Sequence, residues 1–417
     1  MDKLAAWAIN SDDLLRPIPA TMESTPAVKS DAVTQPGTSA IKTNALPEKH
    51  WPFLDFIRFA AALLVLFGHS RGLLLEGIGR VEHPNVFVRG LYLISGLQHE
   101  GVVLFFIVSG FLVGGSAWRM QSAGRFDFGT YFVNRFARIY LVYIPALALV
   151  LLIDFLGKHY FIDSRFYGLR PLPPSNLYDD WMWSQIPCHL AALQGILCTP
   201  WGVNPPVWSL GYEWAFYLIA PAVFSLLLMP MRRKGADLFI VAVILIALTW
   251  WNADWLTWFL MWLLGAFAAK MFKKKKIGIS IGLIGLACCG GAIIVSRLAI
   301  LPQGVTDWIV ALGIAAAIAS PPLMKISAGI PGVQRGAGFS YSLYLIHLPV
   351  CVFIGALYER LLQWPGQLVQ PDVKGIAGFV GMTAMALIVA YLFARFTEDH
   401  TAAFRRKLMQ WRARLMG

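Results

Sequence analysis

Long apolar runs separated by short polar segments dominate this sequence. A helix needs about 17 to 25 mainly apolar residues to cross a bilayer, and ten runs meet or approach that length. The pair 237–252 and 254–272 gives the weakest signal and equally fits one helical hairpin with shifted ends. The pattern predicts an all-α, polytopic membrane helix bundle of about ten transmembrane helices. The runs lie at 52–75, 100–118, 131–156, 207–230, 237–252, 254–272, 277–296, 304–324, 339–358 and 375–396.

The polar segments divide the chain into three parts. Residues 1–50 carry scattered prolines and bury too little apolar surface to fold alone, so we expect a disordered tail. Residues 51–400 form the predicted transmembrane domain, and 401–417 form a basic tail. The first apolar stretch, 4–9, is too short for a secretory signal peptide. We also expect no appended extracytoplasmic domain.

Charge is sparse and unevenly distributed along the chain. Charged residues make up 14% of the sequence, against about 25% in soluble domains. The net charge of +12 comes largely from Lys and Arg in alternate loops, which favours membrane topology over nucleic-acid binding. By the positive-inside rule, these loops and both termini face the cytoplasm. The clusters are Arg119 and Arg125, Arg232, Arg233 and Lys234, 273–276, Lys325 and Arg335, and Arg405, Arg406, Lys407, Arg412 and Arg414.

The longest segment on the opposite side, about 157–206, is rich in proline and tryptophan. Residues 186–197 predict a short interfacial or re-entrant helix, and a lid that merely packs on the bundle explains the loop equally well. Cys188 and Cys198 both fall here, where an oxidising compartment allows a disulfide, although spacing alone does not establish one. We identify no Cys/His cluster with the spacing of a metal site.

Three ionisable residues interrupt the first apolar run. Asp55 lies one turn before Arg58, and His69 follows Arg58 by eleven residues. That separation returns a helix to within roughly 20° of the same face and advances it by about 16 Å. Charges at membrane depth are costly and usually face a bundle interior or a water-filled path. The run therefore predicts a polar path through the membrane that contains a titratable imidazole.

Five sequence blocks, in order, resemble the acyltransferase-3 family of membrane O-acyltransferases. The first has ten residues between Arg58 and His69, the third contains an RxxR pair, and the fourth an SxxxE element. The resemblance covers about residues 51–400. The blocks are 54–69 (LDFIRFAAALLVLFGH), 101–112 (GVVLFFIVSGFL), 134–140 (NRFARIY), 206–221 (PVWSLGYEWAFYLIAP) and 340–349 (SYSLYLIHLP).

Two positions depart from the family pattern. Val103 stands where the second block often has Asp, and Trp214 stands where the fourth block often has a second Glu. Roles attached to those acids therefore do not carry over to this chain.

The resemblance implies that His69 is the catalytic residue. Near neutral pH an imidazole can take a proton from a hydroxyl, which makes that oxygen more nucleophilic toward a thioester carbonyl. Arg58 either holds an anionic donor group or stabilises an oxyanion, or it forms a structural ion pair with Asp55, and these roles are compatible. We expect Asp55 to keep Arg58 oriented.

Two further pairs share a helical face because their members lie three or four residues apart. Arg135 and Arg138 begin the third run and suit the phosphates of coenzyme A, with topology anchoring as the alternative. Glu213, near the outer end of the fourth run, can orient His69 or hydrogen-bond an acceptor sugar. The alternative is a snorkelling acid, with Ser209 as a helix-entry serine.

Three residues are candidates for supporting roles. Ser109 is followed by Gly110, so close helix packing is its leading explanation. Tyr344 and His347 are three residues apart in the ninth run. For these two, a structural hydrogen-bonded pair is as good an explanation as a site.

Together these features predict a membrane O-acyltransferase. The resemblance implies a bacterial inner-membrane enzyme that moves an acyl group from cytosolic acyl-CoA to a hydroxyl of a surface polysaccharide or lipid-linked saccharide. Acetyl-CoA is the expected co-substrate, no cofactor is permanently bound, and succinyl transfer stays open. A transporter or flippase, or a subunit that presents a glycan to other enzymes, also explains ten spans with intramembrane charges. The oligomeric state cannot be read from the sequence.

Overall fold

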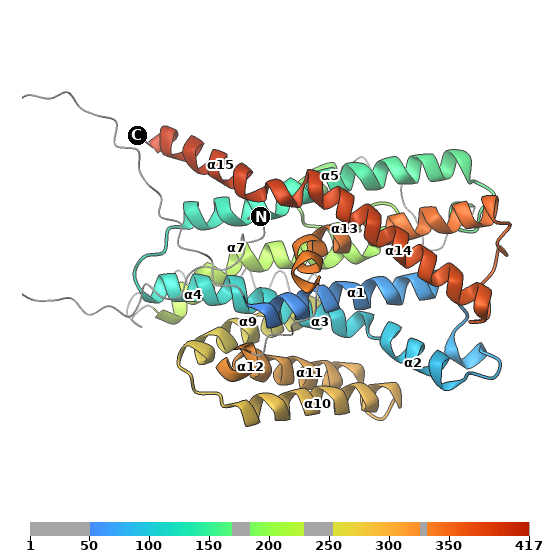
Figure 1. Cartoon of the computed structure of the whole chain (residues 1–417). Helices are drawn as coiled ribbons and strands as arrows, with labels where there is room; N and C mark the ends of the chain where they lie inside the picture. The colour runs from blue at the N-terminus through green and yellow to red at the C-terminus, as the bar shows by residue number, and fades with distance from the viewer. Residues whose placement is uncertain (1–50, 169–183, 229–252, 326–331, 417) are drawn as a thin grey trace, which may run out of the picture. The chain divides into compact units, whose positions relative to one another are not determined.

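The structure of the chain is a computed structural model that describes residues 51–168, 184–228, 253–325 and 332–416. Within these ranges the regular structure is helical, apart from isolated bridges that pair Leu75 with Val369 and Gln194 with Cys198. Figure 1 shows the long helices packed side by side. The predicted tail 1–50 and the predicted run 237–252 lie outside the described residues.

The helices fall where apolar composition places them, with polar or glycine-containing breaks between them. Those that form the body of the bundle are α1 (Pro52–Leu74), α3 (Gln98–Ser109), α5 (Phe128–Tyr160), α7 (Trp208–Leu228), α9 (Ala253–Lys273), α10 (Ile279–Arg297), α11 (Gln303–Ile318), α13 (Val333–Leu361) and α14 (Val373–Phe396). Shorter or terminal helices are α2 (Val86–Ser95), α4 (Gly115–Ser122), α6 (Ile186–Leu190), α12 (Pro321–Lys325) and α15 (Thr401–Met416).

Eight of the described helical segments are long and apolar enough to cross a membrane. These are Pro52–Leu74, Val86–Ser122, Phe128–Tyr160, Pro205–Leu228, Asp254–Lys273, Ile279–Arg297, Val333–Leu361 and Val373–Leu415. A ninth apolar helix, Gln303–Ile318, is shorter. The chain is therefore an all-α polytopic membrane protein, as the hydropathy pattern predicts.

Two predicted spans differ in extent from the structure. The run 100–118 belongs to a longer segment that begins at α2, whose first turn is capped because the Asn85 side chain accepts a bond from the Val88 amide at 2.9 Å. The run 304–324 is divided, because α11 ends at Ile318 and Pro321 begins α12. Proline lacks an amide donor and so favours a new helix start over continuation.

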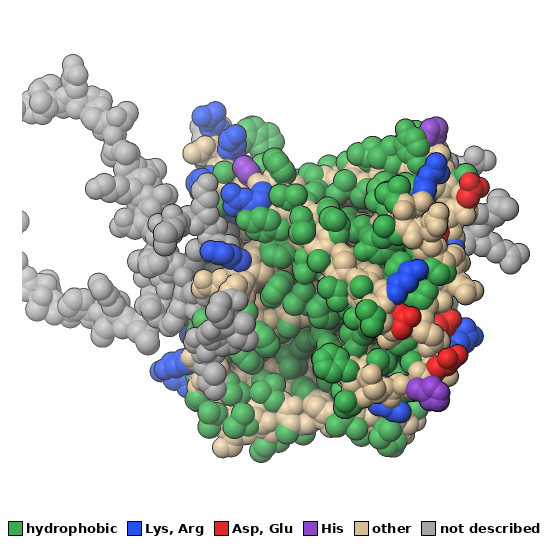
Figure 2. Space-filling model, turned by 45° about the vertical axis from the view of Figure 1, so that its right-hand side comes forward, with side chains coloured by type: hydrophobic (Ala, Val, Ile, Leu, Met, Phe, Trp, Pro, Cys, Tyr) green, Lys and Arg blue, Asp and Glu red, His purple; other side chains and the backbone are tan. Residues whose placement is uncertain are grey.

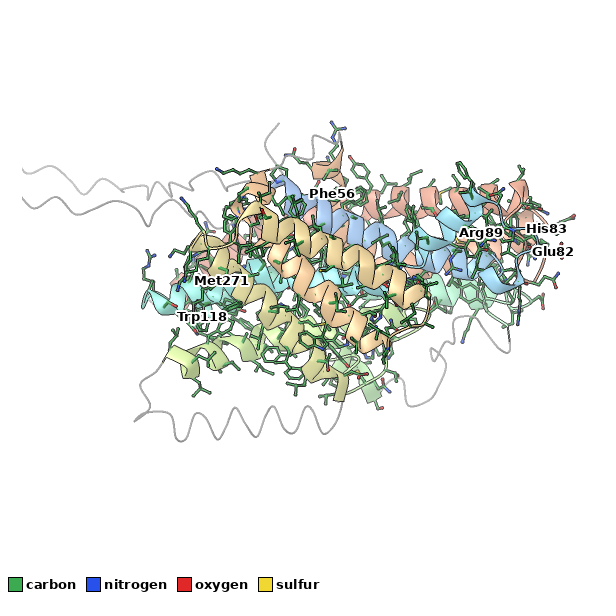
Figure 3. The ribbon with its side chains drawn as sticks, turned by 90° about the horizontal axis from the view of Figure 1, so that it is seen from below. Phe56, Glu82, His83, Arg89, Trp118 and Met271 are labelled. Carbon is green, nitrogen blue, oxygen red and sulfur yellow. A yellow bond between two sulfur atoms is a disulfide. The ribbon has the colours of Figure 1, made fainter. Side chains whose placement is uncertain are left out.

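The bundle has two chemically different ends. The basic end is defined here by Arg119, Arg125 and 273–276. In Figure 3 it is located by the labels of Trp118 and Met271, which are close to these residues in the sequence. The mixed-charge end, defined by Glu82, His83 and Arg89, lies at the opposite end of the bundle in that view. Figure 2 shows a wide apolar surface between the two ends. Such a surface suits lipid.

Small residues let the central helices approach closely. A side chain at Gly110 would overlap the backbone oxygen of Trp262, and one at Gly265 would overlap the carbonyl of Ile107. These contacts join α9 both to α3, through Ile107, and to the π-helical turn Gly110–Gly114 that follows it. Close approach through small residues is how membrane helices gain packing contacts without a hydrophobic driving force. The packing predicted at Gly110 is therefore present.

The helix α15 docks against the start of α5 at the basic end. Arg412 lies 2.7 Å from Asp127, which also caps α5 by accepting bonds from Thr130. The bonds from Thr130, with a contribution from Arg412, lower the pKa of Asp127 to about 2. Residues 401–416, predicted as a basic tail, thus form a helix with a defined contact on the bundle.

Within 157–206, the predicted outer loop, the helix expected at 186–197 is shorter in the structure. Helix α6 covers only 186–190 of the expected 186–197. It ends because Ala192 and Gly195 adopt positive φ angles of 54° and 82°, which an α-helix does not allow. Cys188 and Cys198 form a disulfide across this turn.

Candidate active site

His69 on α1 and His347 on α13 face one another inside the bundle. The distance between Nδ1 of His69 and Nε2 of His347 is 3.1 Å. Each ring also has a backbone partner, since Nδ1 of His69 lies 3.0 Å from the Val65 carbonyl oxygen and Nδ1 of His347 lies 2.8 Å from that of Tyr344. His347 is 1% exposed, whereas His69 is only partly buried. The His347 ring is thus enclosed, and the His69 ring is the more accessible of the two.

The Arg58 guanidinium lies nearer the start of α1. It is 3.5 Å from the Asp55 carboxylate and donates a bond to the Ala337 carbonyl at 3.3 Å. It also interacts electrostatically with Arg138, Glu398 and Glu213. The predicted Asp55–Arg58 pair is present, and it sits among charges from three other helical segments.

The two arginines of α5 have different partners. Arg138 is buried and lies 2.6 Å from Glu398, and its guanidinium stacks over the Tyr341 ring at 5.2 Å. Glu398 also accepts bonds from the backbone amide and hydroxyl of Ser342, at 3.1 and 2.9 Å. Arg138 therefore has a carboxylate partner within the protein, before any donor molecule binds.

Arg135 is less engaged than its neighbour one turn away. It lies over the Tyr131 ring at 6.0 Å, and its buried Nε has no hydrogen-bond partner among the described atoms. It is also close enough to Glu213 to interact with it electrostatically. No carboxylate among the described residues pairs with Arg135, and this arginine therefore keeps hydrogen-bonding capacity for an anionic ligand.

The Glu213 carboxylate is the acceptor of a buried polar network. Ser109 donates to it at 2.5 Å, and the Tyr217 hydroxyl donates to the same oxygen. The Ser109 hydroxyl in turn accepts a bond from the Trp262 indole at 3.1 Å. Packing alone therefore does not account for Ser109. The hydrogen bonds join Glu213 to this network, while those of His69 lead to Val65 and His347.

Ser209 and Tyr344 form a second buried pair between α7 and α13. Their hydroxyl oxygens are 2.5 Å apart, and Tyr344 donates to the Pro206 carbonyl at 2.8 Å. The Tyr344 ring stacks on Phe105 with centroids 5.6 Å apart. Although Ser209 and Glu213 lie one turn apart on α7, they thus have separate partners.

One helix, α13, contacts residues of each group that the sequence singled out. Since α1 and α13 both run toward the mixed-charge end, these contacts form a series along the bundle. In chain order the pairs are Ala337 with Arg58, Tyr341 with Arg138, Tyr344 with Ser209, and His347 with His69. Four of the residues that the sequence indicated, Arg58, Arg138, Ser209 and His69, therefore lie in order beside α13.

Three polar residues of this interior were not identified from the sequence. Tyr217 had a signal, because it lies one helical turn after Glu213 and so shares its face. Glu398 follows the last predicted span and Trp262 resembles any interfacial tryptophan, so neither had a local signal. Their roles depend on contacts with residues that are more than 100 positions away.

The described residues contain no group of three or more His, Cys, Asp or Glu side chains arranged to hold a metal ion. What the interior does offer is an imidazole pair, clustered guanidinium groups and hydrogen-bonded acids. These are the groups that acid–base and anion-binding chemistry requires.

Comparison with known proteins defines the family. The sequence model of the acyltransferase domain matches residues 51–395. An uncharacterised protein of Haemophilus influenzae is 30% identical over 150 residues, which cover 34% of this chain and 55% of that protein. The chain therefore spans about half the length of this curated relative. No solved structure matches it. Because the family match covers most of the sequence, the chain belongs to the acyltransferase-3 family and is a multi-pass membrane protein.

Proposed function

We propose that this protein transfers an acyl group from cytosolic acyl-CoA to a hydroxyl of an extracytoplasmic glycan or lipid-linked saccharide. Acetyl is the expected group, and His69 is the general base. The observation that carries the proposal is the series of contacts along α13. It joins the arginines nearer the basic end to the imidazoles nearer the mixed-charge end.

The donor binds, in this proposal, through the guanidinium groups. Coenzyme A is polyanionic, and planar guanidinium groups can form two parallel bonds to phosphate. Arg135 has hydrogen-bonding capacity for such a contact. A basic end that faces the cytoplasm would place this binding region on the side where acyl-CoA is made.

The chemical step requires one proton acceptor and stabilisation of one oxyanion. The Nε2 atom of His69 takes the proton of the acceptor hydroxyl as that oxygen attacks the thioester carbonyl. The carbon–sulfur bond then breaks, and His69 passes the proton to the sulfur atom. An ester and a free thiol leave the site. A guanidinium or hydroxyl donor can stabilise the oxyanion formed between these events.

The direct biochemical test uses inverted membrane vesicles, which expose the cytoplasmic face to added donor. Vesicles with the wild-type protein should move radiolabel from acetyl-CoA into the saccharide fraction. His69→Gln should lower that rate by about 10²–10⁴-fold, because it removes the base. Succinyl-CoA in parallel tests the choice of acyl group.

The matched control is Cys351→Ala. Cys351 lies one turn after His347 and contacts Ser70, the neighbour of His69, at 3.5 Å. This variant disturbs the same helix pair but keeps both imidazoles, so it should retain transfer. Equal transfer by the wild-type protein and a folded His69→Gln variant would remove His69 from the mechanism. Radiolabel that crosses the membrane without becoming attached to saccharide would instead indicate a transporter.

A further inference from the structure

We infer that His347 is a positioning residue that fixes the tautomer of His69 and leaves Nε2 of His69 as the unprotonated base. This inference rests on the proposed function and adds a second imidazole to its mechanism. It follows from three contacts, one between the two rings and one from each ring to a backbone carbonyl oxygen.

The protonation of the enclosed ring, His347, is fixed by its backbone contact. Nδ1 of His347 lies 2.8 Å from the Tyr344 carbonyl oxygen. A carbonyl oxygen can only accept a hydrogen bond, so this nitrogen must carry a proton. A neutral imidazole carries one proton, and therefore Nε2 of His347 is an acceptor.

The second ring follows from the first. The acceptor Nε2 of His347 lies 3.1 Å from Nδ1 of His69, and the Val65 carbonyl lies 3.0 Å from the same nitrogen. Both neighbours accept, so Nδ1 of His69 must carry the proton and share it between them. The lone pair of neutral His69 is then at Nε2. The two carbonyl contacts and the contact between the rings agree on this assignment.

Burial decides which ring meets the substrate. His347 is almost fully enclosed, while His69 keeps part of its surface accessible. When Nε2 of His69 accepts a proton, the resulting cation keeps its Nδ1 bond to two acceptors, and those bonds stabilise it. This is the logic by which a second group orients a catalytic imidazole. Here an imidazole bonded to a backbone carbonyl takes the place that a carboxylate often fills.

Two variants separate this role from packing. His347→Phe keeps a ring of similar size but has no acceptor, whereas His347→Gln keeps an acceptor oxygen. We expect His347→Phe to lower kcat by about 10- to 100-fold, with an unchanged KM for acyl-CoA. His347→Gln should recover most of that loss, and Cys351→Ala should resemble the wild-type protein.

A spectroscopic measurement tests the inference without turnover. In nanodiscs with ring-¹⁵N histidine, the His69 and His347 signals are assigned by their loss in His69→Gln and His347→Gln. At neutral pH we expect each ring to carry its proton on Nδ1, with both Nε2 atoms unprotonated. A proton on Nε2 of either ring would overturn the inference.

The kcat values of the His347 variants give a second test of the positioning role. Wild-type kcat in His347→Phe, or equal losses in the Phe and Gln variants, would also overturn the positioning role while leaving His69 as the base. If His69→Gln itself transfers acyl groups normally, the proposed function fails instead. The nitrogen protonation states still decide the tautomer in that case.

Discussion

Arg135 and Arg138 lie one turn apart but differ in what holds them. Glu398 pairs with Arg138 at 2.6 Å, whereas no carboxylate among the described residues pairs with Arg135, whose guanidinium lies over the Tyr131 ring. Arg135→Ala should therefore weaken acyl-CoA binding by one or more charge-assisted bonds, worth about 1.5–3 kcal/mol each. Titration of acyl-CoA in nanodiscs measures this as an increase in Kd at unchanged thermal stability.

Arg138→Ala should act mainly on stability, because it leaves the Glu398 carboxylate buried with only the Ser342 donors. Breaking a buried ion pair from one side costs about 3–5 kcal/mol. Thermal unfolding in detergent should therefore occur at lower temperature than for Arg135→Ala. The opposite order, with the larger binding defect in Arg138→Ala and the larger stability defect in Arg135→Ala, would contradict this division of roles.

Glu213 belongs to a network that a substitution can either keep or break. Glu213→Ala leaves the buried Ser109 and Tyr217 hydroxyls without their acceptor, at about 1–3 kcal/mol for each group. Glu213→Gln retains one oxygen acceptor and should be more stable than the alanine variant. Differential scanning of both variants checks the order, and equal stability would mean that the network contributes little.

Acyl transfer by Glu213→Gln answers a separate question. A folded variant with wild-type transfer would limit Glu213 to a structural role. A large loss of kcat at retained stability would support the predicted role of Glu213 in orienting His69 or in bonding the acceptor.

Pairs within one helix are readable from a sequence, and pairs between helices are not. Helical spacing was enough to predict that Asp55 lies beside Arg58, and the structure confirms the pair. The contact of His69 with His347 joins positions 278 residues apart. It depends on how α1 meets α13, which hydropathy does not encode. Tyr344 and His347 contact one another through the Tyr344 carbonyl, but their side chains also contact Ser209 and His69 on other helices, which the sequence does not indicate.

Among the elements, the segment that the Cys188–Cys198 disulfide closes contains a buried titratable side chain. His189 is fully buried, stacks on Trp201 with centroids 4.0 Å apart, and bonds through Nδ1 to the Gln185 carbonyl at 3.0 Å. Burial lowers the pKa of His189 below its ordinary value. The neutral form is therefore the one that the folded loop accommodates.

This loop should lose stability as the solution becomes acidic. As pH falls through about 6.5, unfolded His189 takes up a proton before the folded residue does, so the free energy of local unfolding decreases. Hydrogen exchange of residues 184–207 is compared at about pH 5.5 and about pH 7.5, on either side of the ordinary histidine pKa. After correction for intrinsic rates, exchange should be faster at the lower pH. His189→Gln should remove the difference, and an equal pH effect in that variant would assign it elsewhere.

The limits of helices were harder to predict than their existence. Long apolar runs identified α5 and α14 because few charges interrupt them. The start of the second span was missed, because Arg89 and Gly90 interrupt the apolar residues of α2. The outer-loop helix was predicted too long, since the positive φ at Ala192 has no signature in residue type. Tertiary contacts therefore decide the element ends.

At the scale of the whole molecule, the account depends on which end faces the cytoplasm. The positive-inside rule predicts that the basic end does. Single cysteines at 119–130, at 273–276 and in α15 should react with an impermeant thiol reagent only in inverted vesicles. Cysteines at 160–168 or 184–187 should react in intact spheroplasts. Labelling of the outer loop from the cytoplasmic side would leave the series of contacts along α13 without a purpose.

The disulfide gives this orientation an independent check. Cys188 and Cys198 are paired in the structure, and such bonds persist in oxidising compartments rather than in the cytoplasm. Thiol alkylation of the denatured protein should therefore leave both cysteines unmodified until a reductant is added. Free thiols at both positions in protein from intact cells would argue for a cytoplasmic loop.

Acyl transfer to a glycan is tested by mass spectrometry of envelope glycans from cells that lack this protein and are complemented with it. We predict that glycans gain the mass of one acyl group with the wild-type protein and with Cys351→Ala, but not with His69→Gln at equal membrane abundance. The same acylation with His69→Gln as with the wild-type protein would contradict the account.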